Sequence, residues 1–416
     1  MPQPLLSPEP TTPIHDQPTS RTSLAAQILT VLAIALAAAP YWLSFGVGVL
    51  ALGYVVVSGP IRLPHRTTVA FLAWCAVTVT WSDLPAESLQ AVLMLAVFTV
   101  ALWGLVGHLS PTMVYSALAT AMKVLVTATI LVFVAVPSYG REVAGDHVGA
   151  LKGAFPTRNA AAFVLGIALV LFLFQAVGPA LRRRAGSAAW GVVTLAALVA
   201  TESSTGLAVA VLGSATLLFA LRLHRWRPWL RKVIAFLMLT GTALAVVASL
   251  RNIAVVSGLL GRDTTLTGRT AIWQAAEPFM QARPWWGYGW GSLWSEHSVI
   301  SRVMWQDARF VFPNAHNAYI EAILQVGIIG LVLLLLVVVT ILGTAGRRVL
   351  THHGDPWATW PLAMVAMLLV HSISESSMVS FDGFGMLVIA LALLHTAGTL
   401  RPAPAGDRTA MAGLPL

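Results

Sequence analysis

The chain has 416 residues, of which 57% are hydrophobic and only 10% are charged. Soluble domains carry about a quarter charged residues, so this composition excludes an ordinary soluble protein and predicts an all-α polytopic membrane protein. The net charge of +9 does not indicate nucleic-acid binding, because basic residues of membrane proteins gather in cytoplasmic loops. The single cysteine, Cys75, excludes an internal disulfide and a cysteine metal site.

Residues 1–23 contain six prolines and little apolar sequence, which predicts a disordered cytoplasmic tail. Residues 24–400 form the predicted transmembrane domain, and residues 401–416 form a second cytoplasmic tail. About twelve apolar segments of roughly 15 to 25 residues are expected to span the bilayer. They are 24–39, 43–59, 67–81, 88–107, 112–136, 159–177, 187–201, 204–221, 232–250, 317–343, 357–373 and 383–400.

The distribution of Lys and Arg predicts the orientation. With a cytoplasmic N-terminus, fifteen of the 25 basic residues lie inside and nine lie outside. This bias favours both termini in the cytoplasm and a long extracytoplasmic loop, 251–316, before the tenth span. The nine outer cations all lie in two loops, 137–158 and 251–315, which suggests an anionic ligand on that face. The alternative is that they pair with outer acids such as Glu142, Asp146, Asp263, Glu277 and Asp307.

The first of these loops ends in Gly153-Ala154-Phe155-Pro156-Thr157-Arg158-Asn159, directly before a span. Arg158 would begin a helix there, although a cation is not favoured at a helix N-terminus. It either extends to the membrane interface or grips a phosphate at the membrane surface, and the sequence leaves both roles open.

The long outer loop is predicted to contain an amphipathic helix at the membrane surface. Ile272, Trp273, Ala276 and Met280 recur at helical spacing after Gly268, and Pro284 would end the helix. Six of the fifteen tryptophans fall in this loop. Tryptophan is common at membrane interfaces, and an indole ring also packs well on a sugar, so the two interpretations stand together.

His316 ends the outer loop beside the N-terminus of the next span, where Asn314 or Asn317 can cap the helix. A helix N-terminus disfavours the imidazolium and so favours a neutral histidine, the usual general base for a hydroxyl proton. The alternative is an ordinary polar role for His316 in capping or at the interface.

Taken in order, these motifs resemble the O-antigen ligase and Wzy polymerase superfamily, most specifically over residues 200–335. The matching positions are Gly268, Arg269, Trp273, Pro284, Gly287, Gly289, His316, Asn317, Gly327 and Gly330. Fainter marks are Trp81-Ser82-Asp83-Leu84-Pro85 and Gly153 to Asn159. One departure is Glu202-Ser203-Ser204-Thr205-Gly206, where members often carry a basic residue. Arg158, Arg251 or Arg262 would have to replace it.

The resemblance implies a glycosyltransferase of the bacterial inner membrane. It would move a glycan from a polyprenyl-diphosphate donor to an acceptor hydroxyl at the outer leaflet, with inversion and without a metal or cofactor. It implies that His316 takes the acceptor proton and that Arg269 stabilises the departing diphosphate. The substrate-binding residues would be Arg158, Arg251, Arg262, Asn317 and Trp273.

Two other function classes remain at this stage. A structural or scaffolding membrane protein is one of them, but it gives no reason for the ordered motifs of the outer loop. A transporter or flippase of lipid-linked saccharides would also need basic residues on both faces, but it would require ionisable groups at the bilayer midplane. Lys123 is the only Lys or Arg placed there. Within the enzyme class, a ligase and a polymerase share the same machinery, and the sequence identifies neither the sugar nor the acceptor.

Overall fold

The computed structural model describes residues 20–35, 41–59, 63–143, 147–178, 184–223, 226–227, 229–231, 233, 268–351 and 356–399. Within these ranges the regular structure is helical, apart from an isolated bridge between Arg141 and Leu151. The helices are α1 Ser20–Ala35, α2 Tyr41–Ser58, α3 Arg66–Thr78, α4 Pro85–Gly107, α5 Pro111–Ala135, α6 Pro137–Gly140, α7 Arg158–Val177, α8 Arg184–Ala200, α9 Ser204–Arg222, α12 Arg269–Ala282, α13 Val299–Ala308, α14 Ala318–Thr351, α15 Thr359–His371 and α16 Phe381–Thr399. Short 3-10 turns are η1 Val79–Trp81, η4 Pro356–Ala358 and η5 Ser377–Val379.

These helices make the protein an all-α membrane protein with several apolar helices. Eleven of the twelve expected spans coincide with a described helix, and the ninth, 232–250, lies outside the described residues except for residue 233. Among the described helices, five are long and apolar enough to cross a bilayer: α4, α5, α7, α9 and α14. The helices α1, α2, α8, α15 and α16 are shorter but also apolar. The count of twelve spans stays a prediction, and the tails 1–19 and 401–416 lie outside the described residues.

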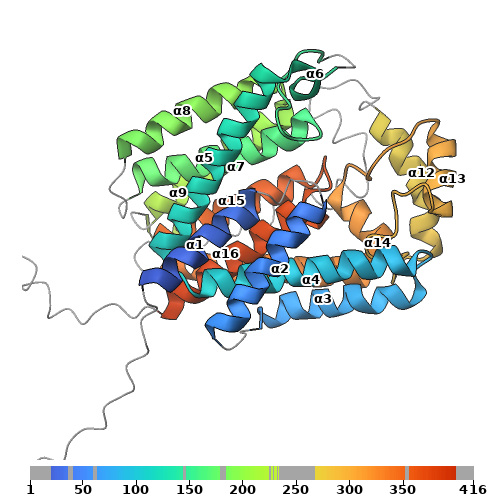
Figure 1. Cartoon of the computed structure of the whole chain (residues 1–416), viewed down its shortest axis with the longest axis horizontal. Coiled ribbons are helices and arrows are strands. Elements are labelled where there is room, and N and C mark those ends of the chain that lie inside the picture. Colours follow the sequence, from blue (N-terminus) through green and yellow to red (C-terminus); the bar gives the residue numbers. More distant parts are fainter. Residues whose placement is uncertain are drawn as a thin grey trace, which may run out of the picture.

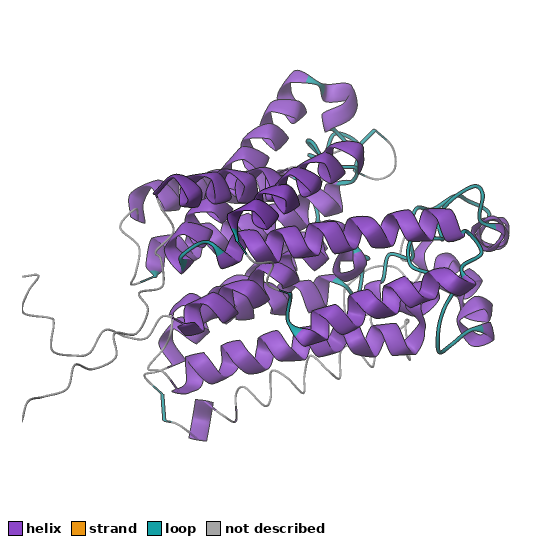
Figure 2. Ribbon diagram, turned by 60° about the horizontal axis from the view of Figure 1, so that its bottom comes forward, coloured by secondary structure: helices purple, strands orange, loops and turns teal. Residues whose placement is uncertain are grey.

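The long helices run side by side along the molecule, and α12 and α13 lie together at one end (Figure 1). The helix α7 packs against α8 and α9, and α15 packs against α9. On the other side of the bundle, α4 packs against α2 and α16, and α14 packs against α3 (Figure 1). Figure 2 shows that the described parts of the chain are helices joined by loops. Large apolar side chains such as Val57, Val192 and Val211 remain exposed on the outside of the bundle. A bilayer accounts for such a surface, since water would disfavour it.

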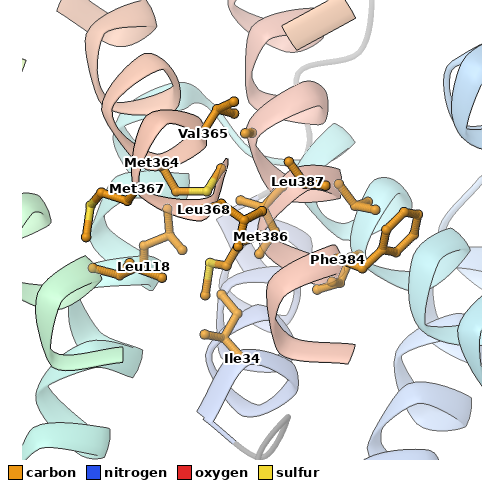
Figure 3. Packing of buried hydrophobic residues seen from close by; sticks show 14 of the residues in the cluster. Ile34, Leu118, Met364, Val365, Met367, Leu368, Phe384, Met386 and Leu387 are labelled. Atoms are coloured by element: carbon orange, nitrogen blue, oxygen red, sulfur yellow. The ribbon is translucent and has the colours of Figure 1, made fainter. Parts of the chain in front are cut away.

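The core between the helices draws buried side chains from most of the bundle, including α1, α5, α15 and α16. Figure 3 shows Ile34, Leu118, Leu368 and Leu387 from these four helices converging on one region. All four side chains are buried. Burial of this kind is non-directional, so polar contacts, not the core, must set the fine geometry of any site.

Polar side chains mark where several helices begin. The hydroxyl of Thr157 accepts from the Ala160 amide at the start of α7, and Ser298 accepts from the Ser301 amide at the start of α13. Helices α4 and α5 begin with a proline, which lacks the N–H that would be unpaired there.

The described part of the outer loop, residues 268–316, folds into a cap whose apolar cluster also includes Ile320 and Leu324 of α14. Its helix α12 confirms the helix predicted from the spacing of Ile272 and Trp273, and both side chains are buried. Tyr288, Met304 and Phe312 complete the same cluster. That α12 lies at the membrane surface stays a prediction.

The helix α14 is interrupted at Gly327, whose backbone is non-helical with φ 70° and ψ −177°. At this interruption, backbone groups of the outer loop form hydrogen bonds with the backbone of α14. On one side, the Tyr288 amide donates to the Leu324 carbonyl at 2.9 Å. On the other, the Ile328 amide donates to the Pro284 carbonyl at 2.8 Å. Backbone groups that the break removes from the helix are therefore paired with the cap.

Residues 284–291, here called the docking segment, approach α14 through positions that only glycine can occupy. A Cβ on Gly327 would lie 2.2 Å from the carbonyl carbon of Trp285. A Cβ on Gly287, which has a φ of +65°, would lie 2.6 Å from the carbonyl carbon of Gln325. The two glycine motifs noted in the sequence therefore form one joint between the cap and α14.

Candidate functional site

His316 lies where the cap meets α14, and its neighbours fix its backbone. Its φ is 48°, in the left-handed region, and its amide donates to Asn314 Oδ1 at 2.8 Å. The preceding carbonyl, of Ala315, accepts from the indole N–H of Trp273 at 2.8 Å. A non-glycine residue with this backbone is held by its surroundings, and such residues cluster at functional sites.

Asn317 caps α14, as one of the two alternatives in the sequence predicted. Its Oδ1 accepts from the amides of Tyr319 and Ile320 at 3.0 and 3.1 Å. Its Nδ2 donates to the Ile373 carbonyl at 3.0 Å, and the side chain is fully buried. Asn317 therefore joins the start of α14 to the turn that follows α15.

Glu321, one turn into α14, accepts hydrogen bonds from several segments around His316. Its Oε2 accepts from the Ala315 amide at 2.7 Å and from the Ser376 hydroxyl at 3.4 Å. Its Oε1 accepts from the indole N–H of Trp294. The carboxyl group is buried and collects donors from three separate segments, so it fixes the backbone immediately before His316.

Glu375 connects the two residues to which the sequence assigned chemistry. Its Oε1 lies 2.6 Å from the Nη2 of Arg269, and its Oε2 lies 3.0 Å from the Nδ1 of His316. The side chains of Arg269 and Glu375 are 8% and 13% exposed, whereas that of His316 is 24% exposed. His316 is therefore the most accessible member of the trio.

The protonation of Glu375 follows from its neighbours. Burial by itself would raise the pKa of Glu375, but the hydrogen bond from His316 and the charge of Arg269 outweigh it and lower the pKa to about 2. A carboxylate only accepts hydrogen bonds, so Nδ1 of His316 must be the donor. In the neutral ring, Nε2 then carries the lone pair and can accept a proton.

The network continues from Glu375 into α7 and α9. Asn159 donates through Nδ2 to Glu375 Oε1 at 2.8 Å and accepts through Oδ1 from the Ser203 hydroxyl at 2.9 Å. Ser203 also accepts from the Gly206 amide at 3.1 Å and is fully buried. Residues 202–206, where the sequence departs from the pattern of the superfamily, thus border the site.

Arg158 directly precedes Asn159 in the chain and contacts the backbone of Thr201 and Glu202 at the edge of the site. Its Nη1 donates to the Glu202 carbonyl at 2.7 Å and to the Thr201 carbonyl at 3.4 Å. Its side chain is half-buried. Of the three arginines considered as replacements for the missing basic residue, Arg158 is therefore placed beside that position, while Arg251 and Arg262 lie outside the described residues.

The structure thus brings His316, Arg269, Asn317 and Trp273 together. Arg158 directly precedes Asn159, which is hydrogen-bonded to Glu375. The tryptophans of the cap differ in their exposure. Trp273 is 5% exposed, whereas Trp285 and Trp286 are 54% and 48% exposed.

Sequence reasoning missed Glu375, and it named Asn159 and Ser203 within motifs without assigning a role to either. Arg269 does pair with an acid, as the alternative in the sequence allowed, but that acid is Glu375, which was not among those considered. Glu375 follows an apolar span by only a few residues, and an ionisable group in such a place is a signal that could have identified it.

Two comparisons with known proteins bear on this site. Residues 189–335 match the model of the O-antigen ligase family, a region that includes Arg269 and His316 but not Glu375. The exopolysaccharide production protein ExoQ of Rhizobium meliloti (strain 1021) is 29% identical over 289 residues. That match covers 63% of this chain and 65% of the relative. Both comparisons confirm the resemblance of this chain to the O-antigen ligase and Wzy polymerase superfamily.

Proposed function

We propose that the protein is a glycosyltransferase of the bacterial inner membrane that moves a glycan from a polyprenyl-diphosphate donor to an acceptor hydroxyl at the outer leaflet. The observation that carries the proposal is the contact of one carboxylate, Glu375, with both Arg269 and His316. The cluster offers a proton acceptor beside a cation, the two groups that such a transfer needs. The relative's name, an exopolysaccharide production protein, supports a role with glycans.

His316 is the general base in this proposal. Its Nε2 takes the proton of the acceptor hydroxyl as that oxygen attacks the anomeric carbon of the donor sugar. The new bond from carbon to oxygen forms while the bond from carbon to the diphosphate oxygen breaks, and the diphosphate leaves with the electron pair. One displacement of this kind inverts the configuration at the anomeric carbon.

Arg269 and Arg158 are assigned to the diphosphate. Charge grows on the diphosphate as it leaves, and a cation held in place by Glu375 stabilises that charge without having to reorganise. Arg158, beside residues 202–206, takes the place of the missing basic residue, since guanidinium suits phosphate oxygens. Arg251 and Arg262 remain candidates for the same role.

The structure changes what we propose for Asn317 and Trp273. The polar atoms of both side chains are hydrogen-bonded within the protein, to α14, to Ile373 and to Ala315. Both side chains are buried. We therefore assign them to positioning His316 and not to substrate contact, and we place sugar stacking on the exposed rings of Trp285 and Trp286.

The test uses the purified protein in lipid nanodiscs with a polyprenyl-diphosphate-linked oligosaccharide. Product formation should fall by about 100- to 10,000-fold in His316→Ala, the usual effect of losing a general base. His297→Ala is the matched control, because His297 lies in the same cap with a side chain 80% exposed. Equal turnover of H316A and wild type would return His316 to a purely structural role.

The same assay separates a polymerase, which we favour slightly, from a ligase. A polymerase supplied with lipid-linked repeat alone should give a ladder of products. A ligase should consume the donor only when a separate acceptor glycolipid is added. Movement of the lipid-linked donor between leaflets without any change in its length would instead favour the flippase alternative.

A further inference from the structure

A cavity lies between the start of α3 and the helices α4, α14 and α16, away from Glu375. Its volume is about 350 Å³. The directions in which the helices run place this cavity at the end of the bundle opposite to Glu375. His65 precedes the start of α3, Arg348 lies near the end of α14, and His395 lies near the end of α16, whereas α14 begins next to His316. Pockets for small ligands typically measure roughly 300–1,000 Å³, so this cleft is large enough to hold a head group.

The ionisable groups that line the cleft are all basic. They are His65, Arg348 and His395, and among the described residues that line it there is no carboxylate. Burial lowers the pKa of His65, and the charges of Arg66 and His395 lower it further. Neighbouring cations thus disfavour the charged form of His65, and an anion in the cleft would relieve that repulsion.

The remaining walls combine hydroxyl groups with apolar surface. Thr340 and Thr344 lie one turn apart on α14, and the Trp103 ring lies 5.6 Å from the His395 ring. Beside them on α14, Leu336 and Val339 are 44% and 57% exposed on the outer surface of the bundle. The cleft therefore adjoins the surface that faces the acyl chains of the bilayer.

We propose that this cleft binds the phosphate group of an anionic phospholipid from the leaflet at this end of the bundle. Arg348 supplies a guanidinium, whose planar fork matches phosphate oxygens, and the Thr344 hydroxyl supplies a further donor, while the Thr340 hydroxyl already donates to the Leu336 carbonyl. The acyl chains would lie along Leu336 and Val339. Basic pockets between membrane helices bind lipid head groups by the same physics. The inference does not depend on the proposed transfer reaction.

Native mass spectrometry of the purified full-length protein tests the proposal, with short-chain phosphatidylglycerol, phosphatidylcholine and inorganic phosphate as separate probes. We expect Arg348→Gln to weaken phosphatidylglycerol binding by about tenfold, the effect of losing a charged contact to phosphate. Arg347→Gln is the matched control, because Arg347 is the next residue, is exposed and does not line the cleft. Phosphatidylcholine, which has no net charge, should bind more weakly to the wild type.

A second variant keeps the test decisive if Arg348→Gln fails to fold, since Arg348 also donates to the Leu394 carbonyl. Thr344→Val keeps the shape of the side chain and removes only the hydroxyl, and it should weaken binding several-fold. Unchanged phosphatidylglycerol binding in the lining variants would overturn the site. Competition by inorganic phosphate at the same concentration as the lipid would overturn the assignment to a lipid.

Discussion

Glu375 contacts both Arg269 and His316, so its removal should affect activity more than a surface carboxylate would. In Glu375→Gln, the amide no longer requires Nδ1 of His316 to be the donor, and the ring loses the partner that orients it. We expect turnover to fall on the order of 100- to 10,000-fold, the range seen when a carboxylate that orients a histidine is removed. Glu375→Asp should recover part of the activity. The exposed Glu277, changed to Gln, is the control.

The lowered pKa of Glu375 also predicts how stability depends on pH. A carboxyl group whose folded pKa lies at about 2, below the unfolded value of roughly 4.3, stabilises the fold fully above the unfolded value. That stabilisation is lost as the pH falls toward 2. The difference in Tm between wild type and E375Q should therefore be largest above about pH 5 and shrink in more acidic buffer. A difference that is constant from pH 7 to pH 3 would argue against an ionised, paired Glu375.

Arg269 is expected to need its guanidinium and not only its charge. In Arg269→Lys the ammonium can keep an ion pair with Glu375, but it loses the planar two-point geometry that serves a carboxylate and a phosphate. Turnover should fall by about tenfold or more. Arg302→Lys, an exposed change in the same cap, should leave turnover intact. If R269K matches wild type, Arg269 does not contact the diphosphate.

The joint between the docking segment and α14 is predicted to be intolerant of any side chain at Gly327. Alanine there would be strained by the positive φ, at a cost of about 1–3 kcal/mol, and its Cβ would collide with the carbonyl of Trp285. Gly327→Ala should therefore lower the Tm and reduce activity. Gly343→Ala on the same helix is the control, because a Cβ there meets nothing within 4 Å.

That joint shows how far the sequence could predict the structure. Apolar segments predicted the helices well, because burial and length are local properties of the sequence. The spacing of Gly287, Gly289 and Gly327 marked unusual backbone, but nothing in it showed that the two motifs meet. Glu375 was missed for a related reason. Its contacts with Arg269 and Asn159 join residues 106 and 216 positions apart, and no local pattern encodes such pairs.

For the molecule as a whole, the predicted orientation places the cap outside the cell membrane. A cysteine at the exposed position Glu296 should react with an impermeant thiol reagent in intact cells, while one at the exposed position Gly186 should not. The native Cys75 is fully buried and should give little background. Labelling at residue 186 but not at residue 296 would place His316 in the wrong compartment for an outer-leaflet donor.

The interrupted helix α14 also constrains how the protein is made. An unpaired backbone group within lipid costs several kcal/mol. Before the break, the carbonyls of Leu324 and Gln325 accept from amides of the docking segment, and after it the amides of Ile328 and Ile329 donate to carbonyls of the same segment. The docking segment precedes α14 in the chain, so it is synthesised first, and in the predicted orientation it must already be across the membrane when α14 enters. We therefore expect membrane insertion of α14 and translocation of the cap to be coupled steps. A chain whose cap stalls on the cytoplasmic side would leave α14 incomplete, and such a chain would be a natural substrate for quality-control proteolysis.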